Sequence, residues 1–174
     1  MTNVIVHEGA METMLPDLRR GALDMVVGRL SNQVHARDLA EEPLFHGHIV
    51  VVTRRRHPLA KRRNLDWRDL LEYPWVVPPV ESQSREPLEN ILQKHGIAIP
   101  ANRIETVSVH VVTGYLMETD AVGFLSQGVA RHYIKSGALT QLPLALPDPQ
   151  RPNGITWIAH KQLSPAAKVF TACL

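Results

Sequence analysis

Short runs of apolar residues alternate along this sequence with segments in which apolar residues recur every three or four positions. The short runs have the length of buried strands, and the periodic segments have the spacing of amphipathic helices. The first half of the chain predicts strands at residues 4–6, 23–27, 44–45, 49–52 and 75–77. The second half predicts strands at residues 104–107, 122–125 and 155–159, with an extended segment over residues 139–146. Such alternation is typical of an α/β fold.

The first predicted helix carries four apolar residues on one face between positions 11 and 18. Pro16 lies inside this pattern and would remove a backbone hydrogen bond unless it belonged to the first turn. We therefore expect the helix to start near Thr13 and Gly21 to end it. The run at residues 23–27 is almost continuously apolar, as expected of a buried parallel strand.

Further helices are predicted at residues 66–72, 109–118 and 129–136, and from Ser164 onward. Ser82 or Ser84 can cap another helix, which carries Leu88 and Leu92 on one face and which Gly96 ends. The recurrence of strand and helix in this half predicts a second parallel sheet.

Composition narrows the class of protein. Hydrophobic residues make up 44 % of the 174 residues, charged residues 21 %, and the formal net charge is +2. These values exclude a disordered chain and a role in bulk polyanion binding. Cys173 is the single cysteine, so an intramolecular disulfide and a C-x-x-C motif are excluded, and we expect a reducing cytoplasm. No apolar run reaches the roughly 20 residues of a membrane span, and the first residues do not resemble an export signal, so no membrane partner is expected.

Motifs for metal binding and for catalysis are weak. Nine histidines are present, and His46 and His48 are the tightest pair, but no H-x-x-x-H or HExxH spacing occurs. We therefore expect no metal and no cofactor, and we place His46 and His48 beside a strand. Ser126 in GFLSQG lacks the glycine that a nucleophile elbow needs two residues earlier, where Phe124 stands. The sequence therefore predicts no catalytic residue and no enzyme.

Two basic clusters lie in the middle of the chain, at residues 54–56 and 61–63. Such clusters usually form a solvated loop, which is the interpretation we favour. A contact with another subunit or with a phosphate backbone is the alternative.

Seven segments, in this order, resemble the effector-binding domain of LysR-type transcription regulators. They are EG, LRRGALDMVVGRL, EEPLF, VVVTRRRHPLA, YPWVVPP, GFLSQGVAR and LSPAAKVF, and together they span the chain. Each segment alone is a weak signal, whereas seven in the same order at matching intervals make coincidence improbable. Within the family, the sequence is similar to members that sense sugars or aromatic acids.

The resemblance implies the fold of the type 2 periplasmic binding proteins. In that fold two Rossmann-like α/β lobes are joined by two crossing strands, which here correspond to residues 49–53 and 155–160. Lobe one is then expected to comprise residues 1–51 and 158–174, and lobe two residues 52–157. A ligand is expected in the cleft between the lobes.

Two parts of a complete regulator have no counterpart in this sequence. No segment resembles the helix-turn-helix, so we expect DNA contact only through a domain outside this chain. By the resemblance, the first strand and first helix of lobe one are also absent. We expect their absence to leave strand edges without partners, at about 1 kcal/mol for each lost hydrogen bond.

Candidate ligand contacts lie where strands end and helices begin, since helix N-termini attract anions. The resemblance implies that five residues contact the effector, namely Met11, Arg29, Ser82, Gln83 and Ser84. Arg29 could hold a carboxylate or phosphate in two hydrogen bonds, or could form a structural ion pair with Glu8 or Asp24. Ser82 and Ser84 could instead be helix caps. Further candidates follow the expected strands of lobe two, namely Ser108, His110 and Ser126.

These expectations combine into one mechanism. A small anionic or polar metabolite closes the two lobes, and closure alters the geometry of a homodimer or homotetramer and thereby its grip on DNA. A ligand can do this only through its different affinity for the two states. Two alternatives are a stand-alone solute-binding protein of a transport system and an enzyme on the same fold. A signal peptide upstream would favour the first, and a helix-turn-helix upstream would favour the regulator.

Overall fold

The chain divides into two compact units. The computed structural model describes residues 3–30, 37–82, 84–147 and 152–173. Unit 1 comprises Met1–His46 and Gln150–Leu174, and unit 2 comprises Gly47–Pro149. The chain therefore passes from one unit to the other twice, in both cases earlier in the sequence than the boundaries expected at 51/52 and 157/158.

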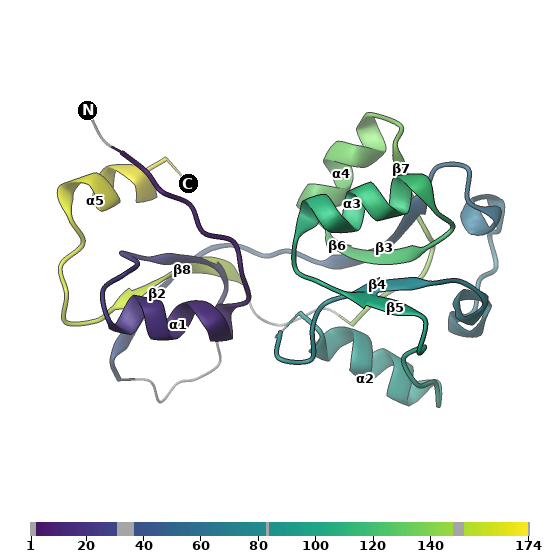
Figure 1. Cartoon of the computed structure of the whole chain (residues 1–174), viewed down its shortest axis with the longest axis horizontal. Coiled ribbons are helices and arrows are strands. Elements are labelled where there is room, and N and C mark those ends of the chain that lie inside the picture. Colours follow the sequence, from purple (N-terminus) through teal and green to yellow (C-terminus); the bar gives the residue numbers. More distant parts are fainter. Residues whose placement is uncertain (1–2, 31–36, 83, 148–151, 174) are drawn as a thin grey trace. The chain divides into compact units, whose positions relative to one another are not determined.

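Unit 1 contains a three-stranded antiparallel sheet. Its strands β1 (Val26–Arg29), β8 (Asn153–Ile158) and β2 (Leu39–Phe45) lie in the order β1-β8-β2. Helix α1 (Met11–Arg19) lies along the sheet in Figure 1, and Leu18 is its buried residue. Helix α5 (Pro165–Thr171) begins after Ser164, whose Oγ accepts a hydrogen bond from the backbone N–H of Ala167 at 3.1 Å. The predicted start of this last helix is confirmed.

Unit 2 contains a five-stranded mixed sheet in the order β5-β4-β6-β3-β7. The strands are β3 (Ile49–Arg54), β4 (Trp75–Val77), β5 (Arg103–Glu105), β6 (Val122–Ser126) and β7 (Leu139–Gln141). Strand β4 pairs in parallel with both β5 and β6. Strand β3 is antiparallel to β6 and to β7. The predicted parallel pairing is therefore confirmed for β4, β5 and β6, and the sheet as a whole is mixed.

Helices cover both faces of this sheet. Helix α2 (Glu86–Lys94) lies on one face, and α3 (Val109–Glu118) and α4 (Gln127–Lys135) lie on the other (Figure 1). Strand residues alternate between the two resulting cores, since successive side chains point to opposite faces. Val51, Trp75 and Phe124 belong to the core that also holds Leu88 of α2, whereas the other core holds residues of α3 and α4.

Local sequence explains where several elements begin and end. The 3-10 helix η2 (Trp67–Glu72) starts at Asp66, whose side chain accepts from the Arg68 backbone, while Asp69 accepts from the Asp66 backbone at 2.8 Å. This reciprocal cap explains the short helix predicted at residues 66–72. Gly21 and Gly96 follow α1 and α2 with φ angles of 78° and 65°, so their predicted role as helix ends is confirmed.

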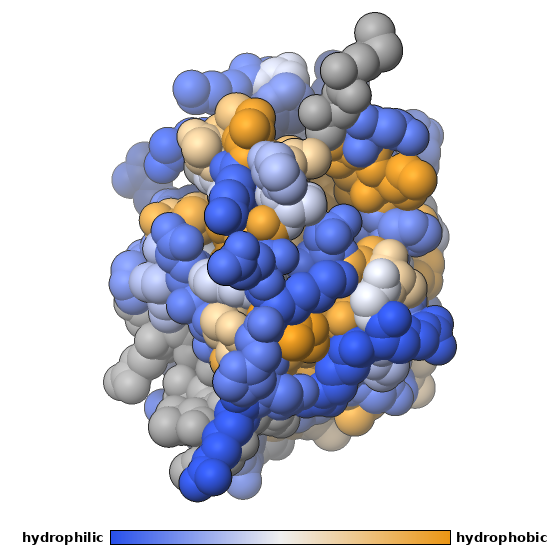
Figure 2. Space-filling model, turned by 90° about the vertical axis from the view of Figure 1, so that its left-hand side faces the viewer, coloured by the Kyte–Doolittle hydropathy of each residue, from blue (hydrophilic) through white to orange (hydrophobic). Residues whose placement is uncertain are grey.

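Two strand predictions in unit 1 are wrong. Residues 4–6 form no strand, and Val4, Ile5 and Val6 are 52 %, 73 % and 82 % exposed, because no strand in the described part of the chain pairs with them. The strand predicted at residues 23–27 lies at Val26–Arg29, and it is antiparallel to β8 rather than parallel. It lies at the edge of its sheet and exposes Val27, so it is not the buried parallel strand that the apolar run indicated. Hydrophobic residues reach the surface in several separate areas of the face drawn in Figure 2.

The predicted start of α1 also requires correction. The helix begins at Met11 rather than near Thr13, because the backbone N–H groups of Thr13 and Met14 already bond to the carbonyl of Ala10. Pro16 therefore lies inside the helix rather than in its first turn. No described helix is long and apolar enough to cross a membrane.

A buried histidine links η1 (Pro58–Lys61) to the sheet of unit 2. His57 is 2 % exposed, and its Nδ1 accepts a hydrogen bond from the backbone N–H of Leu59 at 3.0 Å. Its Nε2 lies 3.0 Å from the carbonyl oxygen of Asp120, to which the neutral ring donates. Burial is the main cause that lowers the pKa of His57, and the nearby Arg54 lowers it further, although Asp120 acts in the opposite direction.

The lowered pKa of His57 predicts a loss of stability in weak acid. A histidine with a lowered folded-state pKa binds its proton more readily in the unfolded chain, so stability falls as pH drops below its ordinary value of about 6.5. Urea unfolding at pH 7.5 and 5.5 should show this drop. It should become smaller in His57→Gln and persist in a control, His132→Gln, at an exposed position. An equal drop in the wild type and in His57→Gln would contradict the assignment.

Gly154 allows β8 to fit between its neighbours. A Cβ atom at this position would collide with the carbonyl oxygen of Glu42 and would lie 2.8 and 2.9 Å from the two methyl carbons of Leu30. Gly154→Ala is therefore expected to lower the free energy of unfolding by at least about 1 kcal/mol. Gly114→Ala is the matched control, because a Cβ atom on this helical glycine meets nothing within 4 Å and should stabilise α3 by about 0.5–1 kcal/mol. Two variants of equal stability in urea unfolding would contradict this account.

Candidate functional site

The carboxyl ends of three parallel strands meet at one edge of the sheet in unit 2. Strands β5, β4 and β6 run in the same direction and lie next to one another. The segments that follow them lead into helices α2, α3 and α4, so three helix N-termini are directed to this edge. The sequence candidates of this unit that the structure describes lie at the ends of these strands, in the following segments or at the start of a helix, namely Ser82, Ser84, Ser108, His110 and Ser126. Gln83 lies outside the described residues.

Two of these serines precede helices without capping them. Ser108 is the residue before α3, and Ser126 is the residue before α4, but neither side chain makes a capping hydrogen bond. The backbone N–H of Ser108 donates to Thr106 Oγ1 at 3.1 Å, which fixes the turn between β5 and α3. Ser126 and His110 are exposed, and Ser108 is half-buried. Their hydroxyl and imidazole groups can therefore reach a ligand at this edge.

The serines after β4 have a different local role from the predicted one. Ser82 is buried, and its Oγ accepts a hydrogen bond from the backbone N–H of Ser84 at 3.3 Å. Helix α2 starts after Arg85 and has no side-chain cap, so the expectation that Ser82 or Ser84 caps it is wrong. The physical reason is that the Ser82 side chain closes a turn of the loop instead. Ser84 is half-buried.

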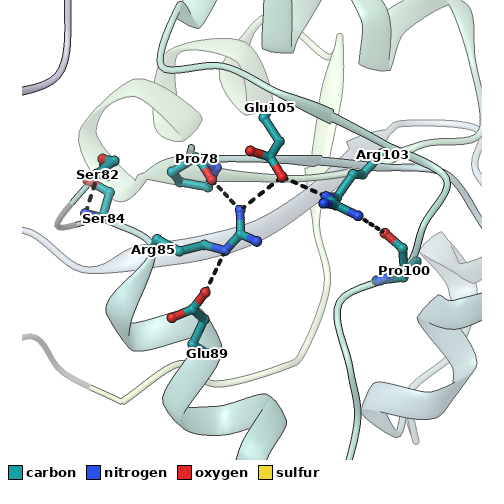
Figure 3. Close-up of polar contacts among 8 residues, drawn as sticks. All are labelled: Pro78, Ser82, Ser84, Arg85, Glu89, Pro100, Arg103 and Glu105. Carbon is teal, nitrogen blue, oxygen red and sulfur yellow. Dashed lines mark hydrogen bonds and ion pairs between the residues drawn. The ribbon is translucent and has the colours of Figure 1, made fainter. Parts of the chain in front are cut away.

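A buried arginine holds this loop in place. The side chain of Arg85 is 5 % exposed, and its guanidinium group donates to the carbonyl oxygen of Pro78 and to Glu89 Oε1, the latter at 3.1 Å. Glu105 of β5 lies 3.8 Å from the same guanidinium group. Figure 3 shows Arg85 between these partners, with Ser82 and Ser84 on the adjoining loop. Arg85 therefore ties both ends of the loop between β4 and α2 to the neighbouring strand β5.

A second arginine completes the pairing of Glu105. Arg103 Nε donates to Glu105 Oε1 at 2.6 Å, and Arg103 Nη1 donates to the carbonyl oxygen of Pro100 at 3.0 Å (Figure 3). The hydrogen bond from Arg103 is the main cause that lowers the pKa of Glu105, and the charges of Arg85 and Arg103 contribute further. Glu105 is therefore a carboxylate at neutral pH and compensates the charge of Arg85.

Unit 1 carries two candidates, one at the start of α1 and one at the end of β1. Met11 begins α1, and its methyl carbon lies 3.6 Å from the position that a Cβ atom of Gly28 would occupy. Arg29 is the next residue along β1 and the last of that strand, and it is half-buried. Glu12 follows Met11, and its Oε2 is buried and accepts no hydrogen bond within the described part of the chain.

Sequence reasoning missed Arg85 and Glu12. The sequence contains Arg85 within the loop already singled out, but a charged residue next to two serines gives no sign that it is buried. Glu12 lies beside Met11, and only the structure shows that one of its oxygens is shielded from water. In the residues that the structure describes, no three histidine, cysteine or acidic side chains lie together as metal ligands would.

The edge of unit 2 is suited to binding rather than to covalent chemistry. N-terminal helical turns present backbone N–H groups that lack partners within their helix, and the aligned peptide dipoles favour negative charge there. Hydroxyl groups from Ser108 and Ser126 add donors and acceptors that no helix cap consumes. The arrangement can hold a small polar or anionic group through several hydrogen bonds.

Comparisons with known proteins identify a family for this chain. The family described as the LysR substrate binding domain matches residues 2–174. The HTH-type transcriptional regulator GalR of Pseudomonas putida is 33 % identical over 171 residues, which are 98 % of this chain and 43 % of GalR. The regulator PcaQ of Agrobacterium fabrum is 33 % identical over 161 residues, which are 92 % of this chain and 52 % of PcaQ. The chain spans about half the length of these relatives.

Solved structures show the same fold. The effector binding domain of QuiR in complex with shikimate has a TM-score of 0.69 at 22 % identity, and the match covers 94 % of this chain and 76 % of that one. The CcmR regulatory domain of Synechocystis in complex with 2-PG has a TM-score of 0.69 at 21 % identity, with 94 % and 77 % covered. The expected periplasmic-binding-protein-like α/β fold is therefore confirmed. The chain belongs to the LysR substrate-binding domain family.

Proposed function

We propose that this chain is the effector-sensing part of a LysR-type transcription regulator. We further propose that the sheet edge of unit 2 binds the polar or anionic group of a small effector. The observation that carries the proposal is the convergence of three helix N-termini, two of them preceded by serines that do not cap, at the carboxyl ends of β4, β5 and β6. Met11 and Arg29 remain proposed effector-binding residues of unit 1.

Each group at the edge has a defined part in this binding. The starts of α3 and α4 attract negative charge, worth about 0.3–1 kcal/mol for each helix. The Ser108 and Ser126 hydroxyl groups donate to the same anion, and hydrogen bonds to a charged group contribute about 1.5–3 kcal/mol each. His110 and Ser84 supply further hydrogen-bonding groups at the rim. The edge therefore favours a small carboxylate or a similar anion.

Arg85 acts as a positioning residue for the loop that carries Ser82 and Ser84. Its guanidinium group is nearly inaccessible and already bonds to Pro78, Glu89 and Glu105, so it supports the loop rather than the ligand. A loop fixed before binding loses less conformational entropy when the effector arrives. The serines are thus presented in a defined geometry.

The ligands named for structural neighbours fit this chemistry. QuiR is described in complex with shikimate, a hydroxylated carboxylate, and CcmR in complex with 2-PG. In the complete regulator, a helix-turn-helix domain supplies the DNA contact. The sensing part acts within a homodimer or homotetramer in the cytoplasm, and it carries out no catalysis and uses no metal or cofactor.

The proposal predicts that serine substitutions weaken effector binding. A thermal-shift screen of small acids, with shikimate, aromatic acids and sugar acids included, identifies the acid that stabilises the chain most. The double variant Ser108→Ala/Ser126→Ala should bind that acid at least about 100-fold more weakly by calorimetry, because two hydrogen bonds to its anion are lost. The control is Ser136→Ala, at the other end of α4, where the hydroxyl donates to the carbonyl of Tyr133. Unchanged affinity in the double variant, or no stabilising acid, would count against the proposal.

Substitution of Arg85 tests its role in holding the loop. Arg85→Ala should lower the free energy of unfolding by about 2 kcal/mol, because it removes hydrogen bonds between a buried cation and its partners. It should also weaken binding of the acid identified above, although Arg85 does not contact it. Arg103→Ala is the control for affinity, because Arg103 shares Glu105 but bonds to neither Pro78 nor Glu89. Urea unfolding and calorimetry measure both effects. An Arg85→Ala variant with unchanged stability and affinity would refute the positioning role.

A further inference from the structure

A hollow lined by three consecutive arginines lies elsewhere in unit 2. Arg54, Arg55 and Arg56 line it together with Met117 of α3 and with Gly137 and Ala138, which follow α4. Its volume is about 340 Å³. None of these residues belongs to the candidate effector site, so the hollow needs its own explanation.

The sheet register places this hollow away from the proposed effector edge. Ile49, at the start of β3, pairs with Ser126 at the end of β6, so β3 runs from the effector edge toward the opposite edge. Arg54 is the last residue of β3 and pairs with Leu139, the first residue of β7. The arginines therefore lie at the edge where β4 and β6 begin. The segments proposed to bind the effector lie at the opposite edge, where these strands end.

The charges of the three arginines are compensated unequally. Arg54 forms an ion pair with Asp120, with its Nε at 2.8 Å and its Nη2 at 2.7 Å from the same carboxylate oxygen. Arg55 and Arg56 are exposed, and neither has an ion-pair or hydrogen-bond partner for its side chain among residues whose placement is described. Two positive charges on adjacent residues therefore remain beside one hollow.

Backbone contacts hold the walls of the hollow together. The backbone N–H of Arg55 donates to the carbonyl oxygen of Ala138 at 3.1 Å. Gly137 has a φ angle of 77°, a conformation that favours glycine. A Cβ atom at Gly137 would also lie 2.8 Å from Arg55 Nη1, so the guanidinium group of Arg55 lies directly against this glycine. The backbone of Arg55 is therefore held by Ala138, and its guanidinium group lies against Gly137.

We propose that this hollow binds the phosphoryl group of a small phosphorylated metabolite, with the guanidinium groups of Arg55 and Arg56 as its two anchors. Each planar guanidinium group can donate two parallel hydrogen bonds, and a tetrahedral phosphoryl group has three terminal oxygens to accept from both anchors. A carboxylate offers only two oxygens. The exposed side chain of Met117 supplies an apolar wall for the organic part of the molecule.

A DNA backbone also presents phosphate groups. The residues around the hollow favour a small phosphorylated metabolite over DNA. The hollow is concave, and the carboxylate of Asp120 lies beside it because it pairs with Arg54, one of the lining residues. An extended polyanion that lies across the rim would approach the carboxylate of Asp120, which disfavours it. A compact phosphate ester inside the hollow contacts the arginines instead.

The experiment titrates the isotope-labelled chain with glycerol phosphate, with glycerol and with a short DNA duplex, and follows the backbone amide resonances. Saturable shifts at Arg55, Arg56 and Gly137 are expected with glycerol phosphate and not with glycerol. Arg55→Gln and Arg56→Gln should each weaken this binding at least about tenfold. Arg131→Gln, an exposed arginine of α4 that does not line the hollow, is the matched control and should bind normally.

Three outcomes would overturn the proposal. One is the absence of saturable shifts with glycerol phosphate. Another is equal weakening by Arg131→Gln, which would indicate a general effect of net charge. A third is that the duplex shifts the same resonances at lower concentration than glycerol phosphate does, which would assign the arginines to DNA instead. The substituted side chains are exposed, so the variants are expected to fold, and their amide spectra report this directly.

Discussion

The parallel alignment of β4, β5 and β6 is the constraint on which the chemistry of unit 2 depends. Strand β4 lies between the other two and is completely buried, with Trp75, Val76 and Val77 each at most 1 % exposed. Trp75 also donates from Nε1 to the carbonyl oxygen of Leu70 at 2.9 Å, and its ring lies against Phe124 of β6 at a centroid distance of 5.5 Å. Because this strand cannot reverse or shift without exposing its core, the three helices that follow must begin at one edge.

The two edges of this sheet differ in chemistry as a result. One edge carries helix N-termini and serine hydroxyl groups, which suit an anion held by many weak donors. The opposite edge carries the end of β3 and two arginines that lack acidic partners in the described chain. Buried polar groups stabilise the framework between them, namely Arg85 near the first edge and His57 with Asp120 near the second. The buried polar groups of unit 2 thus support the fold, whereas the polar groups at the two edges of the sheet remain available for ligands.

The sequence predicted the parts of this fold that depend on local pattern and missed those that depend on partners. The strand at residues 75–77 and the helix at residues 109–118 match β4 and α3, because continuous burial and helical periodicity leave clear signals. The apolar run at residues 4–6 carries no information about which strand would pair with it, so that prediction failed. The role of Ser82 was wrong because a cap and a loop turn use the same side-chain oxygen. Arg85 was missed because burial of a charge depends on Glu89 and Glu105, which the fold brings to it.

Backbone amide shifts show whether an effector binds where β4, β5 and β6 end. The measurement follows the resonances of the labelled chain during titration with the small acid that binds it most tightly. Within unit 2, we expect the largest saturable shifts at Ser84, at Ser108 to His110, and at Ser126 to Gly128. Shifts that leave these residues unchanged and cluster instead where β4 and β6 begin would contradict it.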